Sequence, residues 1–296
     1  MMKCLAAGKF ALVLGLMAAC ASTVSHAAGP RRDGAENPTI LPSSYADVAD
    51  FAADAATIVD ARIRNTTLVE PARAPGLRPG MARLYVTAQV NSVILGHDAV
   101  ARRVAYLLDV PLGENGRPVR VPKQRVLLFA RPVTQANQLV LVDPTAQLPW
   151  TPGRDLTVRD IASELAAHSA PPRVTGIVQA FHVRGTVAGE SETQIFLATV
   201  TGAPVSLSIL RRPEQAPHWV AAFGEIVDES SAAPARRTLG WFRLACGLPA
   251  RIPASVLTGI SADDAVAIAR DYALVMADVG ACDRSAPTTA SATPKP

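Results

Sequence analysis

Alternation of apolar and polar residues is the feature that most constrains what this chain can fold into. Apolar residues recur at every second position over residues 57–64, 84–91 and 104–110. Successive side chains of a strand point to opposite faces, so each segment predicts a strand with one buried face. Residues 126–130 and 139–142 are near-continuous apolar runs, and they predict strands that are covered on both faces.

These five strands follow one helix, and the whole set predicts a small antiparallel barrel. Ser44 is a serine cap ahead of apolar residues at three- and four-residue spacing, which predicts a helix before Thr57. The segment 113–116 reads Gly-Glu-Asn-Gly and supplies the positive-φ residues that a tight connection between the third and fourth strands needs. Closing five strands into a barrel removes exposed strand edges, so we expect an OB-like barrel over residues 44–150.

Residues 55–143 resemble the OB-type barrel of netrin-like modules. The likeness rests on the first strand, on the long second strand that ends at Gly96 and on the apolar strand 126–130. It implies a barrel shape and no particular activity, because such folds serve many functions. The segment lacks the cysteines that netrin-like modules usually carry. The whole chain is also similar to uncharacterised exported proteins of alphaproteobacteria, which carry no established activity.

The second half of the chain predicts an antiparallel β domain followed by helices. Strands are expected over 174–183, 194–200, 205–209 and 219–227, then a helix over 239–244 and a last helix between Ser261 and Gly280. In this last helix the charged residues Arg270, Asp271 and Asp278 are expected to face solvent. The predicted fold class is therefore α+β and β-rich: a small antiparallel barrel, a second antiparallel β domain and a C-terminal helical segment.

A helix is expected to join the two halves, with Thr157 and Asp160 as its capping pair and Pro171-Pro172 after its end. Low periodicity marks the remaining segments as arm and tail. The predicted order is a signal peptide 1–27, a flexible arm 28–43, the barrel domain 44–150, the linker helix 151–172, the second domain 173–282 and a disordered tail 283–296.

The N-terminus has the three-part layout of a secretory signal peptide. Two lysines precede the uncharged apolar run 10–19, and the small residues Ser25 and Ala27 occupy the −3 and −1 positions of a cut after Ala27. The run is too short to span a bilayer, and no later stretch approaches 18 consecutive apolar residues. We therefore expect a periplasmic or secreted chain. Residues 17–20 also resemble a lipobox, so lipid anchoring through Cys20 stays open.

Export decides how the four cysteines are interpreted. Cys4 and Cys20 lie in the leader, which leaves Cys246 and Cys282 as an even pair in an oxidising compartment. Their wide spacing is unlike a Cys-x-x-Cys redox motif, and no His or Cys lies close enough in sequence to complete a zinc site. The sequence therefore predicts a structural disulfide between Cys246 and Cys282.

The charge of the chain is nearly balanced. The formal net charge is +4, and two of the basic residues, Lys3 and Lys9, belong to the leader. The remaining basic residues are scattered along the sequence. Bulk charge therefore gives no electrostatic case for nucleic acid or for anionic lipid as a partner, and no nucleic-acid partner is expected.

No catalytic or cofactor motif stands out in the sequence, and we expect no cofactor and no metal centre. His182 and His218 lie at the ends of expected strands and could converge. With Glu190, Glu192 and Glu225 they are the candidate site residues. Glu190 and Glu192 belong to an acidic, Gly-containing loop that could form a recognition rim.

Two functional hypotheses follow. The first is an exported, non-catalytic cell-envelope protein that binds a protein, a peptide or another envelope component. The alternative is a hydrolase whose site is assembled in the second domain from dispersed residues, because catalytic groups need not be close in sequence.

Overall fold

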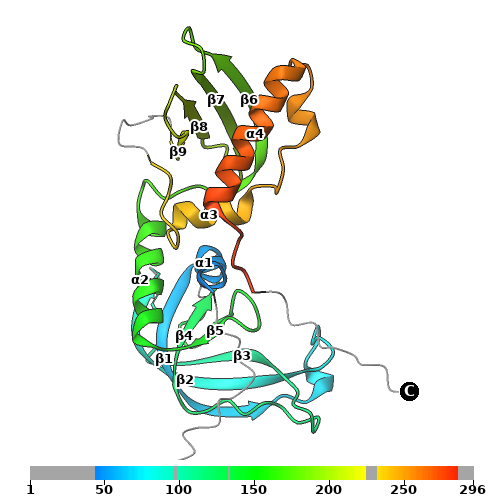
Figure 1. Cartoon of the computed structure of the whole chain (residues 1–296). Helices are drawn as coiled ribbons and strands as arrows, with labels where there is room; N and C mark the ends of the chain where they lie inside the picture. Colours follow the sequence, from blue (N-terminus) through cyan, green and yellow to red (C-terminus); the bar gives the residue numbers. More distant parts are fainter. Residues whose placement is uncertain (1–43, 97–98, 133, 225–231, 286–296) are drawn as a thin grey trace, which may run out of the picture. The chain divides into compact units, whose positions relative to one another are not determined.

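Two antiparallel sheets and four α-helices make up the described part of the chain (Figure 1). The structure is a computed structural model and describes residues 44–96, 99–132, 134–224 and 232–285. In chain order the elements are α1 (Tyr45–Asp54), β1 (Thr57–Leu68), the 3₁₀ turn η1 (Pro71–Arg73), β2 (Met81–Leu95), β3 (Arg103–Pro111), β4 (Arg125–Ala130), β5 (Gln147–Pro149), α2 (Pro152–Ala166), β6 (Val174–Arg184), β7 (Ser191–Thr199), β8 (Val205–Arg211), β9 (His218–Ala222), α3 (Leu239–Gly247), the 3₁₀ turn η2 (Ala254–Leu257) and α4 (Ala262–Val279). The predicted α+β, β-rich class is confirmed.

The first sheet has the strand order β3-β2-β1-β4-β5 and curls into a half-barrel (Figure 1). Every neighbouring pair is antiparallel. The period of two puts Val59, Ala61 and Ile63 on the concave face, where each is at most 1% exposed. Phe129 is fully buried on the other face, where it packs against Phe51 of α1. The alternating pattern of the sequence thus predicted the strands and their buried face correctly.

Residues 136–144 close the half-barrel by bonding to strands on both sides. On one side the amides of Leu139 and Asp109 donate to the carbonyls of Ala105 and Pro144, at 2.9 and 2.8 Å. On the other side the amide of Val142 donates to Phe129 of β4 at 3.0 Å. The strand predicted at 139–142 is therefore wrong: isolated bridges link this segment to β3 and β4. The fifth strand is β5, and the structure places it at Gln147–Pro149.

The second sheet has the strand order β6-β7-β8-β9, and α4 packs beside β6 and β7 (Figure 1). Ile268, Tyr272 and Val275 of α4 are almost completely buried, as are Ile195 and Leu207 of the sheet. These side chains recur at three- and four-residue spacing on the helix and at alternate positions on the strands, so one apolar face of each element faces the other.

Serine and threonine caps define where the helices begin. Ser44 forms the capping box of α1 with Asp47, and the hydroxyl of Ser261 accepts from the amide of Asp264, so both predicted caps are confirmed. The predicted capping pair of the linker helix is wrong. Thr151 caps α2 and Pro152 is its first residue, whereas Thr157 lies inside the helix and donates to the carbonyl of Gly153.

Cys246 and Cys282 are paired as predicted, with their sulfur atoms 2.09 Å apart and their Cα atoms 4.9 Å apart. The next residues correct the predicted tail. Asp283 accepts a bond from the amide of Ala46 at 3.1 Å, and the amide of Ser285 donates to Asp47 at 2.9 Å. Residues 283–285 therefore belong to the folded structure. The rest of the predicted tail, the signal peptide 1–27, Cys20 and the arm 28–43 lie outside the described residues.

Within the described ranges, no helix combines the length and the apolar character that crossing a bilayer requires.

Candidate functional site

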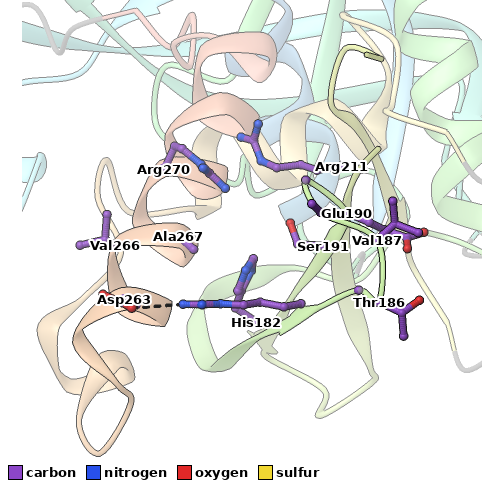
Figure 2. Close-up of a pocket in the computed structure, with 14 residues that line it drawn as sticks. His182, Thr186, Val187, Glu190, Ser191, Arg211, Asp263, Val266, Ala267 and Arg270 are labelled. Carbon is purple, nitrogen blue, oxygen red and sulfur yellow. Dashed lines mark hydrogen bonds and ion pairs between the residues drawn. The ribbon is translucent and has the colours of Figure 1, made fainter. Parts of the chain in front are cut away.

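An open groove of about 600 Å³ lies between α4 and the hairpin that joins β6 to β7 (Figure 2). The hairpin connection, residues 185–190, forms one wall, and Asp263, Val266 and Ala267 of α4 form the other. Four polar side chains reach the space between these walls from three strands and from the helix: His182, Ser191, Arg211 and Arg270. The groove therefore combines a rigid polar floor with a loop wall, an arrangement in which binding residues are often found.

Asp271 is fully buried next to the groove, where its side chain is 0% exposed and accepts bonds from the lining residues Arg211 and Arg270 and from Thr193. The guanidinium of Arg211 donates to it through Nε at 2.7 Å and forms an ion pair at 2.6 Å. Arg270 donates through Nε at 3.2 Å, and the hydroxyl of Thr193 donates at 2.5 Å. A buried carboxylate is costly unless it is paired in this way.

His182 connects the groove to this buried carboxylate. Its Nδ1 lies 2.8 Å from the hydroxyl oxygen of Thr193. That hydroxyl has one proton, which it donates to Asp271, so its oxygen accepts the Nδ1 proton of His182. The chain of bonds therefore runs from His182 through Thr193 to Asp271. This chain uses Nδ1 of the imidazole and does not use the other ring nitrogen, Nε2, and His182 lines the groove.

The charges are unevenly distributed along the groove. Arg211 and Arg270 share one buried carboxylate, Asp271, so these three residues hold one positive charge in excess, while Glu190 contributes one negative charge from the loop wall. Arg184, an exposed residue that also lines the groove, forms an ion pair with Asp263 at 3.2 Å. The side chain of Arg270 is 54% exposed and that of Arg211 is 21% exposed, so guanidinium donors are accessible from the groove. An arginine carries five N–H donors, and Nε is the one that Arg270 uses toward Asp271.

The predicted site residues fall on two different faces of the second sheet. His182 and Glu190 both line the groove. In the register of the sheet, His182 lies opposite Thr193. His218 lies opposite Leu210, and Leu210 lies opposite Glu192. Because adjacent residues of a strand point to opposite faces, His218 and Glu192 lie on the face away from α4. His182 and His218 do not converge, and Glu225 lies outside the described residues.

Three groove-lining residues were not among the predicted candidates, Ser191, Arg211 and Arg270, and neither were the two buried residues bonded to this site, Thr193 and Asp271. Asp271 was even predicted to face solvent, because it is charged. Its position carried the opposite signal, since it is three residues after Ile268 and four before Val275, on the buried stripe of the helix. A charged residue at an apolar position of this spacing indicates a buried ion pair.

Among the described residues, no group of three or more His, Cys, Asp or Glu side chains has the geometry to hold a metal ion. No protein-family model matches the sequence, and no curated protein is similar to it.

Proposed function

We propose that this protein is an exported, non-catalytic binding protein of the cell envelope, which holds an anionic group of its ligand in the groove between the β6–β7 hairpin and α4. The ligand is a protein, a peptide or another envelope component that carries a carboxylate or a comparable anion. The observation that carries the proposal is the pairing of two arginines with one buried carboxylate, Asp271.

The reason is electrostatic. An ion pair fixes Arg211 with two of its donors, and Arg270 is held by a single longer bond. Both guanidiniums are therefore oriented before a ligand arrives, and both line the groove, where a ligand can reach them. Preorganised donors lose little entropy on binding, and charge-assisted hydrogen bonds to carboxylates are among the strongest in proteins.

Calorimetry tests the proposal by comparing two forms of one randomised pentapeptide library. One form has free C-terminal carboxylates, and the other has amidated C-termini. We expect the carboxylate library to bind more tightly. Arg270→Gln should weaken it about tenfold or more, because a hydrogen bond to a charged group is lost. Arg159→Gln is the matched control, since it removes an exposed arginine that pairs with Asp155 on α2. Equal binding of both libraries, or an unchanged Arg270→Gln variant, would refute the proposal.

Export is tested separately, by mass spectrometry of the N-terminus of the protein isolated from its native cells. A chain that begins at Ala28 supports secretion by ordinary cleavage. A chain that begins at a lipidated Cys20 supports the anchored form, and an intact Met1 in the cytoplasm contradicts export.

A hydrolase is the second candidate, and the bonded chain from His182 to Asp271 is the observation that favours it. It ranks lower because the carboxylate does not bond to the imidazole directly, as it does where it stabilises an imidazolium, and because two arginines already neutralise it. Turnover of ester, amide or glycoside substrates that is abolished by His182→Ala would establish the hydrolase in place of the binding protein.

A further inference from the structure

We infer that the convex face of the first sheet is a docking surface for an anionic lipid bilayer, through Arg62, Arg64 and Arg103 with Tyr85 and Leu107 beside them. These five residues are called the convex patch below. The inference is independent of the groove, because none of the five lines it.

The strand register brings the arginines of the convex patch together. Arg62 of β1 is paired with Gln89 of β2, and Gln89 is paired with Arg103 of β3, so the three side chains form one row across the sheet. Arg64 follows at an irregularity in the β1–β2 register and donates to the same Gln89 side chain. Arg103 lies about forty residues after Arg62 and Arg64 in the sequence, which is why the sequence alone does not show the three as one group.

The strands of this sheet contain two carboxylates, and each is occupied by another arginine. Asp60 is 1% exposed and accepts two bonds from Arg125, at 2.8 and 2.7 Å. Asp109 is 4% exposed and accepts two bonds from Arg83, at 2.7 and 2.9 Å. Within the described strands, the charges that remain are therefore the three exposed arginines of the convex patch, and in the described part of the chain none of them forms an ion pair.

Apolar side chains on the same face identify the kind of partner. Tyr85 and Leu107 are paired across β2 and β3 and are each 47% exposed. They lie four residues from Gln89 and Arg103 along their strands, and so point to the same side. Arginine attracts lipid phosphate while tyrosine and leucine gain from the bilayer interface, whereas a nucleic-acid backbone offers leucine no apolar partner. The combination therefore favours a lipid surface.

Vesicle flotation with the full chain tests this inference. We expect the protein to float with vesicles of equal parts phosphatidylglycerol and phosphatidylcholine and to stay behind with pure phosphatidylcholine. Binding should be lost at about 1 M salt, where charges are screened beyond about 3 Å. The triple variant Arg62→Gln, Arg64→Gln, Arg103→Gln should bind on the order of a hundredfold more weakly, because each basic residue near an anionic surface contributes several-fold.

The matched control is Arg120→Gln, Arg212→Gln, Arg251→Gln, which removes the same charge from exposed positions outside the strands of the first sheet. It should bind like the native chain, and circular dichroism should show that both triple variants melt like the native chain. The inference is wrong if the native chain ignores anionic vesicles, or if the control loses as much binding as the patch variant. It is also wrong if a single-stranded DNA oligonucleotide binds through the same arginines as tightly as the vesicles do.

Discussion

Asp271 shows how one side chain can organise a site from the interior. It joins α4 to β7 through Thr193 and to β8 through Arg211, so three elements depend on its charge. Replacing it by Asn keeps the shape but leaves Arg211 without a counter-charge. We expect Asp271→Asn to lower the free energy of unfolding by about 3 kcal/mol, as breaking a buried ion pair does. Urea denaturation of the native chain and the variant measures this difference.

Asp263→Asn is the control for that change. It lies on the same helix and pairs with Arg184, but its side chain is 81% exposed. Solvent screens such a pair, so this variant should unfold close to the native midpoint. Equal losses in the two variants would mean that burial of Asp271 has no special role in stability.

Asp60 gives the first sheet a defined response to acid. Burial acts to raise the pKa of its carboxyl, but hydrogen bonds from Arg125 and Asn91 outweigh it and hold that pKa below its usual range. A carboxyl whose pKa is lower in the folded state than in the unfolded state stabilises the fold at pH values above its unfolded pKa. This stabilisation is lost as the pH falls through the pKa of the folded state. Asp60→Asn should therefore cost about 2 kcal/mol at pH 7. The difference from the native chain should shrink below about pH 4.

Thermal melts of both chains over a series of pH values measure this convergence. A difference that stayed constant down to low pH would show that Asp60 does not bind a proton in that range, and that its partners act through shape alone.

At the scale of single elements, close packing of α3 against β6 depends on Gly247. A Cβ atom at this position would lie 2.6 Å from the backbone carbonyl oxygen of Val174, which cannot move aside like a side chain. We expect Gly247→Ala to lower stability by about 2 kcal/mol through overpacking. Gly153→Ala on α2 meets no atom within 4 Å and should stabilise by about 0.5 kcal/mol. Differential scanning calorimetry of the two variants distinguishes these signs.

The sequence predicted elements best where one local pattern decides the structure. Alternation located β1 to β3, a continuous apolar run located β4, and the serines at 44 and 261 located the starts of α1 and α4. The prediction failed for α2, because Thr151 followed by proline is also a cap and Thr157 has the same residue type. It also failed at 139–142, since apolar residues are buried both in strands and in bridging segments. Whether such a segment is a strand depends on which residues its backbone bonds to, and sequence periodicity carries no information about those partners.

The groove was less predictable than the fold for the same reason. His182 and Glu190 were recognised by residue type, whereas Thr193 and Arg211 have ordinary strand positions. Their role follows from the register that places β7 next to β8 and from the helix that lies over them. Such contacts join residues 78 and 60 positions apart.

At the scale of the whole molecule, the Cys246–Cys282 pair controls how the C-terminal helix is held. It closes 36 residues, which corresponds to about 4 kcal/mol on the chain-entropy model. We expect the double variant Cys246→Ala, Cys282→Ala to melt at a lower temperature than the oxidised native chain. The native chain should melt like the variant once a reductant is added. A variant that melts like the oxidised native chain would show that the bond does not contribute to stability.

Residues 136–144 close the half-barrel of the first sheet, and this closure has a consequence for the rates of folding and unfolding. Hairpins such as β1–β2 and β2–β3 join segments that are near in sequence, and β1 pairs with β4 only after a much longer loop has closed. The closing segment can complete its two rows of bonds only when both β3 and β4 are in place, because one row goes to each strand. Its contacts therefore belong to the late side of the folding barrier. Weakening them, as with Leu139→Ala, should accelerate unfolding while the rate of folding stays nearly constant.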